Sequence, residues 1–235
     1  MTNIALLTTE GGAHARGLAH GRRFAREIAD NVATYLRRFA ASGLGRDQAF
    51  AEATRWRKAI AGQDGAYSEE MRGIAEGSGE TEDTIALLNA RYELAFTLFG
   101  QEARTATKTA VLVGPDGCTT FALLPQAAAD GHTWLGQNWD WLAGVHGRTF
   151  VLRARRTKEP SFVCLTEAGI AGGKMGVNEC GIGLVGRTVS PRAATAAILI
   201  KRRSTCAAGR CWTRRDSRRR CSRSPARRAP AQPIS

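Results

Sequence analysis

Two side chains in the middle of the chain could do covalent chemistry, Cys118 and Asp140. Cys118 lies in the segment Asp-Gly-Cys-Thr-Thr-Phe-Ala at 116–122, and Asp140 lies in Gly-Gln-Asn-Trp-Asp-Trp at 136–141. Each segment is typical of a strand, and a hairpin between the two would bring the thiol near the carboxylate. A carboxylate alone does not activate a thiol, because its negative charge disfavours the thiolate.

The pair becomes reactive if the peptide bond before Cys118 is cleaved. Cleavage would release an α-amino group with a typical pKa of about 7.7–8.0, which could act as general base for its own side chain while Asp140 holds the ammonium form. Gly117 fits an N-to-S acyl shift followed by hydrolysis, because it lets the thiol reach the preceding carbonyl and tolerates strained dihedrals. The alternative is an inert, buried cysteine that begins a strand after a Pro-Asp-Gly turn.

Four groups of short motifs follow one another along the chain. They are Gly73–Gly79 with Leu87-Leu88-Asn89, Gly117–Thr120, Gly136–Asp140, and Thr166–Gly169 with Lys174–Asn178 and Gly181–Gly183. Together they resemble the isopenicillin N acyltransferase family, the acyl-coenzyme A:aminopenicillanate acyltransferases and related amidohydrolases. The resemblance spans residues 10–190 and stops at the C-terminal tail.

Members of this family are N-terminal nucleophile hydrolases made as self-cleaving precursors, and the resemblance implies a four-layer αββα sandwich. It also implies that Cys118 is the nucleophile, that the Gly117–Cys118 bond is the processing site, and that Asp140 lies beside the nucleophile's amine. Three residues are expected to shape the substrate pocket: Gln137, Asn138 and Trp139. The family's oxyanion-hole Asn comes from a later strand, in the region that the tail replaces here.

Other motifs predict neither a cofactor nor a metal. The string Gly181-x-Gly183-x-x-Gly186 matches a dinucleotide-binding pattern, but it continues as a strand and lacks the acidic residue about 20 positions on. The three tail cysteines have no C-x-x-C spacing and no nearby histidine, so a zinc site is not expected. The four histidines are scattered and are expected on the surface or in turns: His14, His20, His132 and His146.

Residues 1–100 are expected to be mostly helical. Between 14 and 42, apolar residues fall on one face at spacings of mostly four, and Gly43 and Gly45 end the pattern. Three more helices are expected, over 46–61, near 68–76 and after Thr81. Glu82 and Asp83 suit the positive N-terminal end of the last of these.

From 105 to 190 the chain is a succession of short segments separated by Gly-containing turns, which predicts strands. The expected strands are 105–113, 119–124, 133–139, 149–155, 161–166, 174–177 and 182–189. Combined with the resemblance, this gives an α+β fold, an incomplete αββα sandwich preceded by a helical segment. Residues 1–117 would form the precursor's N-terminal segment, kept as a small subunit, 118–191 the start of the catalytic domain, and 192–235 a disordered tail.

Charge is concentrated at the C-terminal end of the 235-residue chain, whose net charge is +13. Residues 201–235 hold 12 of the 34 Lys and Arg residues and one of the 21 acidic residues. Residues 1–200 therefore hold 22 basic and 20 acidic residues, a net charge of +2. The tail is rich in Arg, Ala, Pro, Ser and Cys. A GC-rich coding sequence that is read out of frame gives this composition, so a frameshifted or truncated C-terminus is expected. The rival interpretation is a natural disordered arm that binds anions or nucleic acid.

The expected function is to form or cleave an amide bond of a small acyl amide or acyl-coenzyme A substrate, through a thioester on Cys118. Two alternatives remain: an inactive, truncated remnant of the family, or a small basic protein that binds nucleic acid through its Arg-rich tail. Such binding would be non-specific, because Trp212 is the tail's one aromatic residue. No apolar run approaches 18 residues and the N-terminus lacks a secretory pattern, so a cytoplasmic protein without a membrane span is expected.

Overall fold

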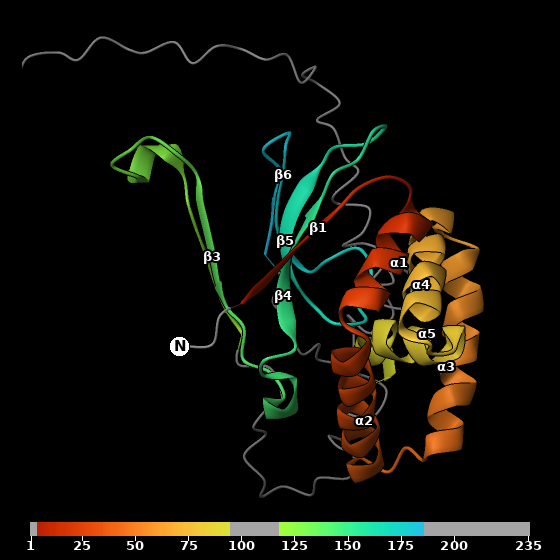
Figure 1. The fold of residues 1–235 in the computed structure, drawn as a ribbon. Helices are drawn as coiled ribbons and strands as arrows, with labels where there is room; N and C mark the ends of the chain where they lie inside the picture. Colours follow the sequence, from red (N-terminus) through yellow and green to blue (C-terminus); the bar gives the residue numbers. More distant parts are fainter. Residues whose placement is uncertain (1–3, 95–117, 186–235) are drawn as a thin grey trace, which may run out of the picture.

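The computed structural model describes residues 4–94 and 118–185, in which helices cover one face of a five-stranded sheet and a two-stranded hairpin lies on the other side (Figure 1). The helices are α1 (Ala13–Arg23), α2 (Ala25–Ala41), α3 (Arg46–Ala61), α4 (Gly65–Ser78) and α5 (Glu82–Asn89). The strands are β1 (Ala5–Thr9), β2 (Thr119–Leu123), β3 (Trp134–Asn138), β4 (Thr149–Ala154), β5 (Phe162–Glu167), β6 (Met175–Asn178) and β7 (Gly183–Leu184). The strand expected over 105–113 and the basic tail, on which the nucleic-acid alternative depends, lie outside the described residues.

The single helix expected over 14–42 is wrong, because the chain leaves helical geometry at Phe24 and forms α1 and α2 instead. Phe24 has φ −126° and ψ 28°, and its ring stacks on Phe150 of β4 with centroids 4.1 Å apart. This contact joins residues far apart in sequence, so the helical periodicity does not reveal it. The remaining helices agree with expectation, and the Thr81 hydroxyl accepts the Thr84 N–H at the start of α5.

Helices α1 and α4 pack backbone against backbone through glycines. These are Gly17 and Gly21 of α1 and Gly73 and Gly77 of α4. A Cβ atom on Gly17 would lie 2.0 Å from the carbonyl oxygen of Glu70, and one on Gly73 would lie 2.2 Å from that of His14. The two helices can therefore pack this closely only with glycine at these positions, because any larger residue would force them apart.

The strand order in the main sheet is β1-β4-β5-β6-β7, with β1 parallel to β4 and the other neighbours antiparallel. The described part of residues 1–100 is mostly helical, as expected, but it also contains β1, which the sequence pattern did not identify: Ala5 pairs with Phe150, and Thr9 with Ala154. A five-residue edge strand with an exposed Leu6 carries little periodic signal, and its partner β4 begins only at Thr149, far along the sequence. The segments 1–117 and 118–191 therefore share one sheet.

One hydrophobic core joins the helices to the covered face of the sheet. Phe150 and Leu152 of β4 and Cys164 of β5 are buried against residues of the helical layer such as Ile28 and Leu88. The fold is thus mixed α and β, as expected. No helix in the described part of the chain is long and apolar enough to cross a membrane.

The expected hairpin between the two chemistry-bearing segments is confirmed. Strands β2 and β3 are antiparallel, with Thr119 opposite Asn138 and Phe121 opposite Gly136. The turn that joins them contains the 3-10 helix Pro125–Ala127 and Gly131, which has φ +70°. In Figure 1 the hairpin extends from the side of the sheet that faces away from the helices.

Candidate active site

The loop from 168 to 173 leads from the end of β5 to Lys174, the residue before β6. Three of its residues have positive φ angles: Gly169 at 91°, Gly172 at 69° and Gly173 at 72°. A side chain at these positions would be strained, which accounts for the glycines in this motif. The loop turns the chain back so that Glu167 and Lys174 lie at the same end of the sheet.

Buried polar side chains from four helices hold this loop. Asn31 donates to the Ala168 carbonyl over 3.0 Å, and Asn89 donates to the Gly169 carbonyl over 2.8 Å. The backbone N–H groups of Gly169, Ala171 and Gly172 in turn donate to His20, Asn89 and Glu70. Because these groups satisfy one another in the interior, they specify one loop conformation.

His20 is not on the surface as expected, since it is 2 % exposed and packs edge-on against Phe150. Burial lowers the pKa of His20 from 6.5 to about 3. The imidazole is therefore neutral at pH 7, and its Nε2 lone pair accepts the Gly169 N–H over 3.0 Å. This histidine supports the loop and its lone pair is already in use.

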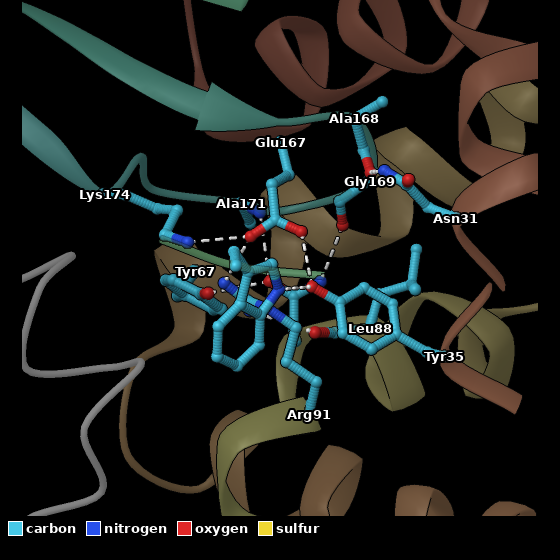
Figure 2. A network of polar contacts seen from close by, with 12 residues as sticks. Asn31, Tyr35, Tyr67, Leu88, Arg91, Glu167, Ala168, Gly169, Ala171 and Lys174 are labelled. Atoms are coloured by element: carbon cyan, nitrogen blue, oxygen red, sulfur yellow. Dashed lines mark hydrogen bonds and ion pairs between the residues drawn. The ribbon is translucent and has the colours of Figure 1, made fainter. Parts of the chain in front are cut away.

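Glu167, fully buried at the end of β5, is the centre of a polar network (Figure 2). Its Oε1 accepts from Lys174 Nζ over 2.8 Å and from Arg91 Nη2 over 3.0 Å. Its Oε2 accepts the Tyr35 hydroxyl proton over 2.6 Å, and that hydroxyl accepts the Trp141 indole N–H over 2.7 Å. Side chains from α2, from the segment after α5 and from the sheet thus meet at one carboxylate.

The network holds two cations against one carboxylate. Burial alone would raise the pKa of Glu167, but Arg91 and Lys174 together lower it to about 2. Burial, aided by the charge of Arg91, lowers the pKa of Lys174 from 10.5 to about 8, although Glu167 opposes the shift. Lys174 is therefore the cation of this cluster that loses its proton most readily.

Aromatic rings surround the Lys174 ammonium. Its Nζ lies 3.5 Å from the centroid of the Trp139 ring, with Tyr92 at 5.5 Å and Trp141 at 5.8 Å. Such cation–π contacts favour the charged form and fix the position of the amine. The Trp139 indole N–H is buried and has no hydrogen-bond partner in the described structure.

Cys118 lies beside this network, immediately before β2, and is 7 % exposed. Continuing the hairpin register by one residue beyond Thr119 and Asn138 places Cys118 opposite Trp139, on which the Lys174 amine rests. Negative charge on Cys118 raises the pKa of Lys174, because the two side chains are close enough to interact electrostatically.

The other predicted residues lie along β3 and just after it. Gln137 is half-buried on β3, whereas Asn138 and Asp140 are exposed. Gly117 lies outside the described residues. The hairpin register thus places Cys118 opposite Trp139, and the roles assigned to all of these residues stay predictions. In residues 4–94 and 118–185, no group of three or more His, Cys, Asp or Glu side chains could hold a metal ion.

A search with protein-family models matches nothing in this sequence. A stretch of 117 residues, 49% of the chain, is 35% identical to the acyl-coenzyme A:6-aminopenicillanic-acid-acyltransferase 40 kDa form of Emericella nidulans. The match covers 28% of that protein's length. This similarity supports a relationship to that acyltransferase, as the sequence motifs predicted.

Reasoning from the sequence missed four residues of the network. They are Tyr35, Arg91, Glu167 and Lys174. Glu167 and Lys174 stood within the recognised motifs, and a Glu and a Lys on either side of a glycine-rich loop are a usable signal. Tyr35 gave no such signal, because it matches the apolar stripe of an ordinary amphipathic helix.

Proposed function

We propose that the protein forms or cleaves the amide bond of a small acyl substrate, with Cys118 as the nucleophile. One observation carries the proposal: Cys118 is buried at the start of the hairpin, beside a lysine that is held by a buried carboxylate and an aromatic ring. The printed name of the related fungal protein describes transfer of an acyl group between coenzyme A and 6-aminopenicillanic acid. A thiol nucleophile suits that chemistry, since it can carry the acyl group as a thioester.

The active form would arise by cleavage of the chain's own Gly117–Cys118 bond. The released α-amino group of Cys118 would serve as the base for its own thiol. Asp140 would hold the ammonium form of that amine. It lies two residues beyond the end of β3, the strand that pairs with β2. Residues 1–117 would remain as a small subunit, joined to the rest through the pairing of β1 with β4.

Turnover would follow three steps. The Cys118 sulfur attacks the acyl carbonyl carbon, and the amine leaves after it takes a proton from the α-ammonium. Water or a second amine then attacks the thioester and restores the thiol. Trp139 would line the acyl pocket together with Gln137 and Asn138, and its unpaired indole N–H could donate to a substrate oxygen.

The proposed architecture is the αββα sandwich, in which a second sheet covers the open face of the first. That face exposes Leu6, Val163 and Val177, which are 58 %, 39 % and 49 % exposed. The hairpin likewise presents apolar side chains, with Phe121 at 56 % and Trp134 at 53 %. Two apolar surfaces of this kind support a further packed layer, because burying them gains about 25 cal/mol per Å².

The mass of the intact chain tests the proposal. Folded protein is expected to yield fragments 1–117 and 118–235, whereas Cys118→Ala stays whole. Cys180→Ala is the matched control, since Cys180 lies in the turn between β6 and β7, and its removal should leave cleavage unchanged. A folded wild-type chain that remains as intact as Cys118→Ala would overturn the proposed function.

A further inference from the structure

The first cleavage poses a problem that the mature site does not have. Before the Gly117–Cys118 bond breaks, the nitrogen of Cys118 belongs to a peptide bond and cannot accept a proton. The base proposed for turnover is therefore absent when the thiol must first be deprotonated. The uncleaved chain needs a second base, and this inference rests on the proposed function.

We propose that Lys174 is the general base that takes the Cys118 thiol proton in the uncleaved chain. Residues directly opposite one another in an antiparallel pair have Cβ atoms about 4.5–5.5 Å apart on the same face. The register that pairs Thr119 with Asn138 sets Cys118 opposite Trp139, and the amine of Lys174 lies 3.5 Å from the centre of that ring. The amine and the thiol therefore share one side of the hairpin.

Burial of Lys174 favours a neutral amine, and the charge of Arg91 adds to this effect, although Glu167 opposes it. Arg91, which is 1 % exposed, already pairs with the Glu167 carboxylate and neutralises its charge. A protonated Lys174 therefore adds a second positive charge beside a single carboxylate. Three ionisable side chains face the amine: Glu167 of β5, Arg91 beyond α5, and Cys118 itself. Tyr92 adds a ring contact, and Tyr35 lies on the far side of Glu167. With a pKa of about 8, Lys174 is close to the operating pH, which suits a general base.

Glu167 also orients the amine. A neutral amine can still donate an N–H to Glu167 Oε1, 2.8 Å away, and its lone pair then points away from that carboxylate. His20 is the other buried nitrogen base among the described residues, but its Nε2 lone pair accepts the Gly169 N–H. The buried nitrogen base available to the thiol is thus Lys174.

The proton and bond changes balance within the chain and one water molecule. The thiol proton moves to Lys174 Nζ as the Cys118 sulfur bonds to the Gly117 carbonyl carbon. The bond from that carbon to the Cys118 nitrogen then breaks, and the nitrogen takes the proton back from Lys174. Water hydrolyses the resulting thioester to a Gly117 carboxylate and the free thiol.

The test is the rate of chain cleavage in full-length Lys174→Arg. Arginine preserves a cation beside Glu167 but cannot accept a proton at neutral pH. Cleavage is expected to slow about 100-fold or more, since general base catalysis contributes about 10²–10⁴-fold. Lys158→Arg, a change at an exposed lysine, is the matched control and should cleave at the wild-type rate.

Two further measurements keep the test decisive if the arginine variant folds poorly. Lys174→Ala should regain cleavage in proportion to added ethylamine free base, and no rescue in a folded sample counts against the proposal. Lys174 can also be titrated by ¹³C-dimethylation in uncleaved Cys118→Ala, which contains five lysines. A midpoint near pH 8 supports the proposal, whereas one near the ordinary 10.5 overturns it.

The outcomes separate this inference from the function on which it rests. A folded wild-type chain that never cleaves overturns both. If wild type and Lys174→Arg cleave at equal rates while Cys118→Ala stays intact, Lys174 is not the base. That result would still support Cys118 as the nucleophile.

Discussion

The carboxylate of Glu167 and the ammonium of Lys174 lie 2.8 Å apart, although seven positions separate the two residues in sequence. They meet because the glycine-rich loop from 168 to 173 turns β5 back toward β6. Arg91 and Tyr35 reach the same carboxylate from the helical layer. The Glu167 carboxylate therefore links the helical layer to the sheet through hydrogen bonds. This network lies close to Cys118, the residue before β2.

Replacing Glu167 by Gln should destabilise the fold strongly. The change removes the charge that Arg91 and Lys174 share, and it leaves at least one buried cation without a partner. Breaking such a pair costs about 3–5 kcal/mol. Urea unfolding should show the loss, while Glu179→Gln, at an exposed residue, should leave the free energy of unfolding unchanged. A loss below about 1 kcal/mol in Glu167→Gln would contradict the network.

Acid should destabilise the protein in two windows. His20 has a pKa of about 3 when folded and 6.5 when unfolded, so the unfolded chain binds the extra proton and stability falls as pH drops from 6.5 toward 3. Glu167 has a pKa of about 2 when folded against 4.5, so its contribution is present above pH 4.5 and is lost as pH falls toward 2. Each group can change the free energy of unfolding by about 1.4 kcal/mol per pH unit.

His20→Gln should separate these windows. The Gln side-chain oxygen can still accept the Gly169 N–H but does not titrate, so the pH dependence between 6.5 and 4.5 should flatten. Melting temperatures at pH 7, 6 and 5 measure this, with His146→Gln, at an exposed residue, as the control. An unchanged pH dependence in His20→Gln would show that His20 is not the residue responsible.

Gly73→Ala should separate helices α1 and α4. The new methyl group would lie 2.2 Å from the His14 carbonyl oxygen, a backbone atom that cannot move alone. Overpacking of this kind costs about 1–3 kcal/mol or more. Gly65→Ala on the same helix has open space around the new atom and should be neutral or slightly stabilising. Equal melting temperatures for the two variants would argue against the close packing of these helices.

Asp140→Asn should slow turnover and leave stability almost unchanged. Asp140 is exposed, so the fold depends little on it, while its proposed contact with the α-ammonium of Cys118 would lose its charge. A charge-assisted hydrogen bond contributes about 1.5–3 kcal/mol, which corresponds to a roughly ten- to hundredfold slower reaction. Amide hydrolysis by the cleaved form measures the rate, and wild-type turnover in the variant would remove Asp140 from the mechanism.

Local patterns in the sequence were sufficient for much of the fold. The boundaries of α3 and the start of α5 follow from apolar spacing and from the Thr81 cap, which are properties of neighbouring residues. The hairpin follows from two alternating segments on either side of a turn. The motifs around Cys118 also pointed to the related acyltransferase, because they keep their order along the chain.

Tertiary structure alone decided the features that join distant residues. Strand β1 exists because β4 offers it a partner, and α1 ends at Phe24, whose ring stacks on Phe150. The pairing of Glu167 with Arg91 brings together side chains 76 residues apart, whose charges are worth most once both are buried. No periodicity or local propensity encodes such a pair, since its energy arises only when the helical layer closes over the sheet.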